Sequence, residues 1–293
     1  NNIIQQMVSG CNRVVNEASP IVDARLENGS RVNVVLKPIA LNGPIVTIRR
    51  FPEKPMDMEK LIELGALQKN HSLFLKKLVL SGYNILISGG TGSGKTTFLN
   101  ALSNYIPREE RVVTIEDSAE LQLVSIENLV RLETRNANAE GCLPITIRDL
   151  IRTALRMRPD RIIVGEVRGA EAVDLLQAMN TGHDGSLSTG HSNSATDLLS
   201  RLETMVLMGM DLPVAAIRQQ IASAVDLIIH LGRLRDKSRK VLEITEVCGY
   251  EEPRVRLKPL FVYHYESEKL EKEGELENVA KLQAAGLDPY AES

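Results

Sequence analysis

A glycine-rich stretch, residues 89–97, carries the residue types best suited to binding phosphate. Its sequence is Gly89-Gly90-Thr91-Gly92-Ser93-Gly94-Lys95-Thr96-Thr97. The short apolar run Asn84–Ser88 precedes it, and Phe98, Leu99 and Leu102 follow at helical spacing. This is the pattern G-x-x-x-x-G-K-[ST] in the strand, loop and helix setting that it requires.

The chemistry of this stretch follows from its residue types. Glycines let successive backbone N–H groups turn toward one anion, and a helix that begins near Lys95 adds its partial positive charge. We predict that the stretch binds ATP, that Lys95 contacts the β- and γ-phosphates, and that the Thr96 hydroxyl binds Mg²⁺. The alternative is a glycine-rich turn without a ligand, which the strand and helix on either side disfavour.

Acidic residues at the ends of two further apolar strands are candidates for catalysis. Hydrolysis needs a carboxylate that orients a water molecule toward the last phosphate. Glu116 and Glu120 follow the apolar run Val112–Ile115, and Glu166 follows Ile162–Gly165. Because ligands bind at the carboxyl ends of strands in open α/β sheets, all three glutamates are candidate catalytic residues. For each one alone, a solvated loop charge is the alternative.

Two of the five histidines, His183 and His191, flank a short strand within residues 181–194. With Asp184 they could bind a metal ion, but the segment offers no third ligand at metal spacing. We favour a γ-phosphate sensor, with His191 as a candidate site residue, because an imidazole N–H can donate a hydrogen bond that is lost when the phosphate leaves. A histidine that only satisfies its own loop stays open for His183.

Arginines gather in two places. Arg49 and Arg50 precede a segment with two prolines, and seven more lie between the two acidic sites: Arg131, Arg135, Arg148, Arg152, Arg156, Arg158 and Arg161. In an oligomer, arginines can act as fingers on a neighbour's nucleotide. Most surface arginines only pair with acids or water. We predict that Arg49 and Arg50 complete a neighbouring site in a ring.

The elements that position these residues divide the chain. Residues 1–50 show an amphipathic helical pattern and then three strand-like runs, Ile21–Leu26, Arg31–Leu36 and Ile45–Phe51, with Asn-Gly turns between them. We expect a small N-terminal α+β domain that is partial, because the chain begins at Asn1 rather than Met and the sheet looks incomplete. Residues 51–56 contain two prolines and are expected to be a linker.

Apolar strands alternate with amphipathic helices from residue 57 to residue 263, which indicates an α/β fold with a mainly parallel sheet covered on both faces. Thr146 and Asp149 show a capping-box pattern at the start of one of these helices. Residues 264–293 are rich in glutamate up to Glu277, and we expect them to form an acidic C-terminal tail with a short closing helix at Val279, Leu282 and Leu287.

Composition limits the possible functions. The 293 residues have a net charge of −3, four Phe and no Trp, which argues against nucleic acid as a partner. No apolar run approaches the length of a membrane span, and no signal peptide is visible. Cys11, Cys142 and Cys248 are far apart and form no CxxC pair, so we expect neither a disulfide framework nor zinc. These features predict a cytoplasmic protein.

Several motifs together resemble the secretion-superfamily traffic ATPases, and among them the CpaF-type ATPases of tight-adherence (Tad/Flp) pilus assembly. The resemblance covers residues 19–260. Besides the glycine-rich loop, its marks are Val22–Leu26, Gly29–Asn33, Thr47–Arg49, Thr114–Asp117, Ile147–Leu150, Ala154–Gly169 and Thr181–Ser186. The sequence shows neither the helical N-terminal region of that family nor the cysteine-rich zinc module of the type II secretion branch.

The resemblance implies a RecA-like P-loop NTPase domain that binds ATP and Mg²⁺, with the nucleotide between it and the small domain in a homohexamer. Residues 116–120 would be the Asp box, Glu166 the Walker B glutamate, and residues 183–191 the His box. The implied function is a motor that hydrolyses ATP to assemble Tad/Flp-type pili. Inner-membrane pilus platform proteins would be its partners at the inner face of the cell membrane.

Three alternatives to this function stay open. One is a type IV secretion ATPase that drives export of protein or DNA, since it shares the same motifs. Another is a slow nucleotide-gated switch. Pilus retraction is the third, because Ala216–Gln219 resembles a motif of retraction ATPases, although the segment also fits an ordinary amphipathic helix.

Overall fold

The computed structural model describes residues 2–9, 15–50, 54–135 and 143–290, and the chain divides into two compact units, residues 1–54 and 55–293. The described part of the smaller unit contains helix α1 (Asn2–Ser9) and strands β1 (Ile21–Arg25), β2 (Arg31–Val35) and β3 (Ile45–Arg49). These strands form an antiparallel sheet in the order β1-β2-β3. Val15, Val22, Val32 and Val34 form its buried cluster, whereas every residue of β3 is exposed.

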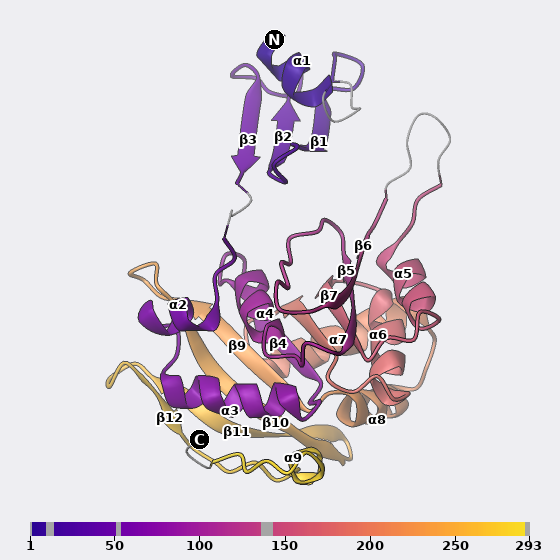
Figure 1. The fold of residues 1–293 in the computed structure, drawn as a ribbon. Helices are drawn as coiled ribbons and strands as arrows, with labels where there is room; N and C mark the ends of the chain where they lie inside the picture. The colour runs from indigo at the N-terminus through magenta and orange to yellow at the C-terminus, as the bar shows by residue number, and fades with distance from the viewer. Residues whose placement is uncertain (1, 10–14, 51–53, 136–142, 291–293) are drawn as a thin grey trace. The chain divides into compact units, whose positions relative to one another are not determined.

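The described residues of the larger unit form a nine-stranded sheet in the order β12-β11-β10-β9-β4-β8-β7-β5-β6 (Figure 1). Its elements are α2 (Met58–Glu63), α3 (Lys69–Leu80), β4 (Ile85–Gly89), α4 (Lys95–Ser103), β5 (Arg111–Glu116), β6 (Asn128–Glu133), α5 (Ile147–Ala154), β7 (Arg161–Val167), α6 (Glu171–Asn180), β8 (Leu187–His191), α7 (Ala195–Gly209), α8 (Val214–Ala224), β9 (Leu227–Arg233), β10 (Arg239–Glu251), β11 (Arg254–His264), β12 (Lys269–Lys272) and α9 (Ala280–Ala284). The six neighbouring strands β9, β4, β8, β7, β5 and β6 pair in parallel. The pairs β9–β10, β10–β11 and β11–β12 are antiparallel.

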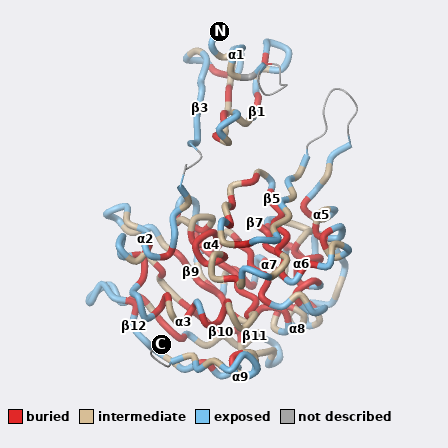
Figure 2. Tube along the Cα trace, viewed as in Figure 1, coloured by how far each residue is buried: buried red, intermediate tan, exposed pale blue. Residues whose placement is uncertain are grey.

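Helices cover both faces of the sheet, as the alternating sequence pattern predicts. Successive side chains of a strand point to opposite faces. Accordingly, Ile85 and Ile87 of β4 pack in one buried cluster with α2, α3 and α4, whereas Leu86 packs in the other with α5 to α8. Figure 2 shows the buried residues concentrated on the central strands and on the helix faces that cover them. The predicted α/β class is therefore confirmed.

The parallel order brings the carboxyl ends of β4, β8, β7 and β5 to one edge of the sheet. Gly89, His191 and Glu116 stand at the last positions of their strands, and Glu166 lies next to the last residue of β7. The glycine-rich loop and all candidate acids thus meet at one edge, although they are far apart in the sequence.

The C-terminal segment differs from the acidic tail expected from residue 264. Strand β12 pairs with β11, and Leu270, Leu276 and Leu282 are buried in the cluster that contains α3. The glutamates between these leucines are exposed, so the segment has a polar side toward solvent and an apolar side packed against the core, although its composition is acidic. The described residues 264–290 therefore belong to the larger unit. Cys11, Cys142, residues 51–53 of the expected linker and residues 291–293 of the expected tail lie outside the described residues.

A buried carboxylate holds this C-terminal segment. Glu246 of β10 is 1% exposed, and its oxygens accept the backbone N–H groups of Glu277 at 2.8 Å and Asn278 at 2.7 Å. Close by, Lys281 Nζ donates to Asp226 Oδ2 at 2.7 Å, and the Tyr83 hydroxyl donates to the carbonyl of Asn278.

Glu246→Gln is expected to lower the free energy of unfolding by about 1–3 kcal/mol, because the buried amide nitrogen cannot accept the second N–H and that backbone donor loses its partner. Urea denaturation followed by circular dichroism measures the change. Glu275→Gln is the matched control, since its ion pair with Lys272 is at the surface. Equal midpoints for the two variants would show that Glu246 does not hold the segment.

Candidate functional site

The glycine-rich loop has the backbone shape of a phosphate cradle. Gly92 and Gly94 adopt positive φ angles of 74° and 94°, which side chains disfavour, and α4 begins immediately afterwards at Lys95. A Cβ on Gly89 would lie 2.5 Å from both the Leu231 carbonyl oxygen and Ser93 Oγ, so no larger residue fits there. The helix N-terminus therefore follows a tight loop, in which the Ser93 N–H donates to the Gly90 carbonyl at 3.3 Å. A helix N-terminus of this kind favours an anion.

Lys95 is the cation of this loop, and it is buried at 8% exposure. Its ammonium donates to the carbonyl oxygens of Gly89 at 3.0 Å and Gly90 at 3.1 Å, and to His191 Nδ1 at 3.2 Å. Burial lowers the pKa of Lys95, and the carboxylate of Glu166 opposes that change. The three N–H groups of Lys95 thus have partners that phosphate oxygens can replace.

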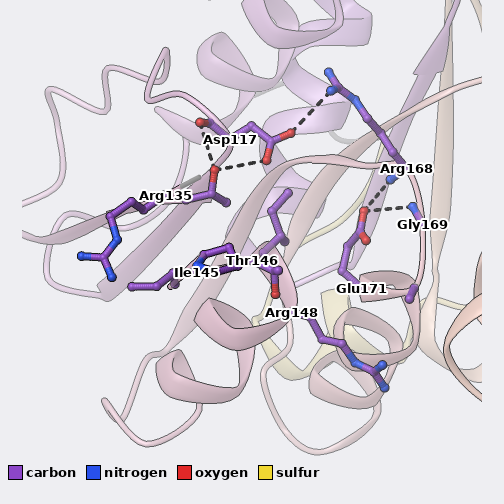
Figure 3. A pocket seen from close by; sticks show the side chains of 12 residues that line it. Asp117, Arg135, Ile145, Thr146, Arg148, Arg168, Gly169 and Glu171 are labelled. Atoms are coloured by element: carbon purple, nitrogen blue, oxygen red, sulfur yellow. Dashed lines mark hydrogen bonds and ion pairs between the residues drawn. The ribbon is translucent and has the colours of Figure 1, made fainter. Parts of the chain in front are cut away.

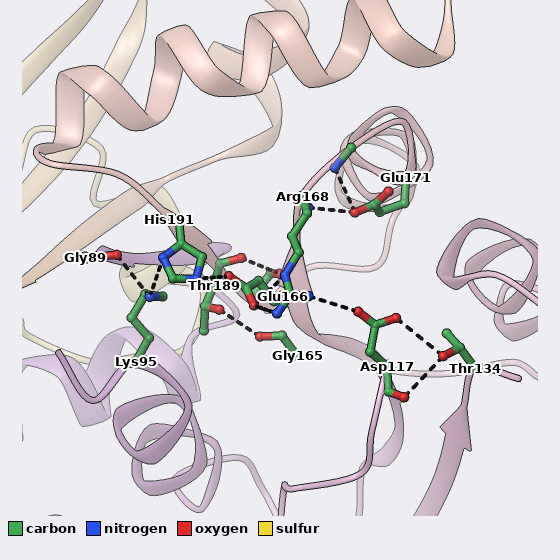
Figure 4. Close-up of polar contacts among 12 residues, drawn as sticks. Gly89, Lys95, Asp117, Thr134, Gly165, Glu166, Arg168, Glu171, Thr189 and His191 are labelled. Atoms are coloured by element: carbon green, nitrogen blue, oxygen red, sulfur yellow. Dashed lines mark hydrogen bonds and ion pairs between the residues drawn. The ribbon is translucent and has the colours of Figure 1, made fainter. Parts of the chain in front are cut away.

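The contacts of His191 define its hydrogen positions. An ammonium only donates, so Nδ1 must accept from Lys95, and the ring hydrogen of a neutral imidazole then lies on Nε2. His191 Nε2 lies 2.8 Å from Glu166 Oε1. Burial lowers the pKa of His191, which favours this neutral form. A contact chain therefore runs from Lys95 through His191 to Glu166, as Figure 4 shows.

An irregularity in β7 positions Glu166. The pairing of β7 with β8 shifts between Val164 and Val167, so one extra residue bulges there. Bulges of this kind redirect side chains and are common next to active sites. The Thr189 hydroxyl fastens the bulge by donating to the Gly165 carbonyl at 2.8 Å. A Cβ on Gly165 would lie 3.0 Å from Glu116 Cγ, so the glycine lets β5 and β7 approach closely.

Glu116, a predicted catalytic candidate, is committed to the backbone. It is 3% exposed, and its Oε1 accepts the N–H groups of Glu120 at 2.8 Å and Leu121 at 3.0 Å. Burial raises the pKa of its carboxyl group, and these two hydrogen bonds oppose the change. Glu116 therefore shapes the turn that carries Glu120, which is itself half-buried.

Arg168, two residues after Glu166, is a cation that the sequence patterns did not single out. Its Nε donates to Glu166 Oε2 at 2.8 Å and its Nη2 donates to the same oxygen, while Nη1 lies 3.4 Å from Asp117 Oδ2. Asp117 in turn accepts from the Thr134 hydroxyl at 3.4 Å. Figure 4 shows Glu166 between His191 and Arg168: Oε2 accepts from Arg168, whereas Oε1 lies 2.8 Å from His191 Nε2 but accepts no hydrogen bond among the described residues.

An open pocket of about 470 Å³ adjoins this chain of contacts. Figure 3 shows Asp117, Arg168 and Glu171 along its rim, with Thr146 and Arg148 on the side of α5. Glu171 accepts the backbone N–H groups of Arg168 at 2.7 Å and Gly169 at 3.0 Å, which fixes the segment after β7. The side chain of Arg168 therefore both lines the pocket and binds the candidate catalytic acid Glu166.

The remaining predicted site residues fall into three groups. Thr91 is exposed and Thr96 and Thr97 are half-buried at the loop and the first turn of α4. His183 precedes the amino end of β8 and contacts the carbonyl oxygen of Ala178 in α6. His191 is the last residue of β8, so the length of the strand separates the two histidines. Arg49 ends β3 and Arg50 follows it, both exposed on the smaller unit.

The site fits a nucleoside triphosphate by the geometry of its own residues. The loop backbone is open at Gly90, where a Cβ would meet no atom within 4 Å, and Lys95 and the start of α4 supply positive charge. Thr96 is the residue that would hold Mg²⁺, as its hydroxyl follows the loop lysine. Among the described residues, no three His, Cys, Asp or Glu side chains gather as a separate metal site.

The fold and the site together define a P-loop ATPase built on a parallel-dominated α/β sheet. Residues 1–273 match the family described as Type II/IV secretion system protein, and the chain belongs to that family. It is therefore an ATPase of the type II/IV secretion superfamily. No helix among the described residues is both long and apolar enough to cross a bilayer.

Individual relatives agree with this assignment. A putative conjugal transfer protein of Mycobacterium tuberculosis is 39% identical over 248 residues, which cover 83% of this chain and 70% of the relative. The type IV secretion system protein PtlH of Bordetella pertussis is 35% identical over 260 residues, 80% of this chain and 77% of the relative. The crystal structure of the VirB11 ATPase from the Brucella suis type IV secretion system is similar with a TM-score of 0.54 and 29% identity, covering 83% of this chain and 81% of that one.

Proposed function

We propose that this chain is one subunit of a ring-shaped motor, a homohexamer, that hydrolyses ATP and drives a secretion or pilus apparatus at the inner face of the cytoplasmic membrane. The observation that supports the motor best is the contact chain from Lys95 through His191 to Glu166. It joins the phosphate-binding lysine to the candidate catalytic acid, so occupation of the loop changes the surroundings of that acid.

In this proposal each residue has a separate task. The loop N–H groups and Lys95 hold the phosphates, and Lys95 exchanges the Gly89 and Gly90 carbonyls for phosphate oxygens. His191 then loses its contact with the ammonium and can respond to the γ-phosphate. Glu166 orients the attacking water, and Thr96 would hold Mg²⁺, whose charge would offset the negative charge that develops on the phosphates. Glu120 stays a second candidate for the water-orienting acid.

The motifs of the chain favour assembly of Tad/Flp-type pili as the task, with inner-membrane platform proteins as partners. The names of the relatives favour a second candidate, export by a conjugal transfer or type IV secretion system. Deletion of the gene, followed by separate assays of surface pili, secreted protein and DNA transfer, distinguishes the two. Complementation with Lys95→Ala shows whether the affected process needs ATP binding. Sustained phosphate release by purified rings would exclude the slow switch, and no turnover in the assembled state would support it.

The ring predicts a shared active site. Arg49 and Arg50 are exposed cations on the smaller unit, and an arginine finger is worth several orders of magnitude in rate. Replacing both by alanine is expected to lower turnover more than it lowers ATP affinity, and wild-type turnover per subunit is expected to rise with protein concentration as rings form.

Steady-state phosphate release and equilibrium ATP binding, measured over a dilution series, test this expectation. Lys54→Ala is the matched control, because Lys54 is an exposed cation of the same unit. Full activity in a dilute monomer, or wild-type turnover in the double variant, would contradict the shared site.

A further inference from the structure

The β9–β10 hairpin places Arg233 and Arg239 against the glycine-rich loop. Strand β4, which leads into the loop, pairs in parallel with β9, and Arg239 lies directly opposite Arg233 across the antiparallel pair β9–β10. A Cβ on Gly92 would lie 4.0 Å from Arg233 Nη1, and one on Gly94 would lie 3.2 Å from Arg239 Cδ. The two arginine side chains thus lie beside the positions that side chains at Gly92 and Gly94 would occupy.

The electrostatics of the hairpin suit an anion. Like charges directly opposite each other on neighbouring strands repel. The ion pairs among the described residues include neither Arg233 nor Arg239. The acid of the hairpin turn, Asp236, accepts the Ser238 N–H at 2.9 Å and its hydroxyl at 2.7 Å, so it caps the turn. Phosphate groups in the loop would relieve the repulsion between the two guanidinium groups.

One hydrogen bond links the hairpin to the shape of the loop. Arg239 Nε donates to the Gly92 carbonyl oxygen at 2.9 Å. In a trans peptide the C=O and the next N–H point in opposite directions, so this bond keeps the Ser93 N–H turned away from the hairpin and toward the Gly90 carbonyl, to which it donates at 3.3 Å. Glycine rotates freely, and a flip of this peptide would turn a carbonyl oxygen toward the bound phosphates. The stem of Arg239 also covers Gly94.

We propose that Arg239 is a positioning residue of the nucleotide site: it holds the Gly92 carbonyl outward and keeps the turn at residues 92–94 in its phosphate-binding shape, while Arg233 adds positive charge beside it. This inference rests on the proposed nucleotide site at residues 89–97. Because the loop backbone cradles the α- and β-phosphates, Arg239 acts on ATP and ADP alike, whereas Lys95 reaches the γ-phosphate.

Binding of ATP and ADP to purified protein tests the role of Arg239. Arg239→Ala is expected to weaken both nucleotides by the same factor, about tenfold, and to raise KM while kcat changes little. Arg239→Gln keeps an N–H donor without the charge and is expected to recover part of the loss. Arg235→Ala, which removes an exposed arginine of the same turn, is the control and is expected to bind as the wild type does.

Two results would overturn the inference. One is an Arg239→Ala variant that binds ATP and ADP as tightly as Arg235→Ala does. The other is a fall in the Tm of the nucleotide-free Arg239→Ala protein large enough to account for the lost affinity, which would indicate a general structural role. Wild-type protein that binds neither nucleotide would instead refute the nucleotide site itself, and this separates failure of the proposed function from failure of the role of Arg239.

Discussion

Replacing Lys95 by alanine is expected to reduce the affinity for ATP by about a hundredfold or more, since a buried charge-assisted contact to phosphate is lost. The side chain is 8% exposed, and its three contacts aim the ammonium at the mouth of the loop. The Gly89 and Gly90 carbonyl oxygens now accept hydrogen bonds from Lys95. Without the lysine they would repel the phosphate oxygens, which adds to the loss.

Equilibrium titration with a fluorescent ATP analogue measures the effect of Lys95→Ala. Lys69→Ala is the control, because Lys69 is an exposed lysine at the start of α3. Unchanged affinity in Lys95→Ala would contradict the assignment of residues 89–97 as the phosphate-binding loop.

The second large effect is expected at Glu166. Glu166→Gln keeps the shape of the side chain but removes the charge that orients water, so turnover is expected to fall by about a thousandfold while ATP still binds. Glu120→Gln is the informative comparison, because the sequence leaves both glutamates open as the water-orienting acid. The contact of Glu166 with His191 favours Glu166, and Glu120→Gln is expected to retain most of the turnover.

Single-turnover phosphate release, with ATP binding measured on the same samples, distinguishes the two glutamates. Glu127→Gln serves as a control at the surface, where its carboxylate pairs with Arg108. A Glu166→Gln variant that turns over normally, with Glu120→Gln inactive, would transfer the catalytic role to the turn that Glu116 shapes.

The fold was predictable where burial imposes a regular pattern. Strands β4, β5 and β7 are apolar on both faces, so continuous apolar runs identified them. Strand β6 lies at the sheet edge with exposed Asn128, Arg131 and Glu133, and this mixed pattern was missed. After residue 264 the expected short closing helix is present as α9, but β12 and the burial of Leu270 and Leu276 were missed, because these leucines are spaced between glutamates and only the packing shows which face is buried.

The site was predictable where residues close in sequence act together. The loop and Lys95 follow from one motif, and Glu166 from a strand that ends in an acid. The partners that cross the sheet were not predictable: Arg239 meets Gly92 across 147 positions, and no local pattern reports such a contact. Arg168 was within reach, since it follows Glu166 by only two residues and stands directly after the end of β7.

Bound ATP and released phosphate, measured together in the wild type, Lys95→Ala and Glu166→Gln, test whether Lys95 binds ATP and Glu166 is needed to hydrolyse it. We expect binding and release in the wild type, neither in Lys95→Ala, and binding without release in Glu166→Gln. Release of phosphate by Glu166→Gln at the wild-type rate, or tight ATP binding by Lys95→Ala, would contradict this expectation.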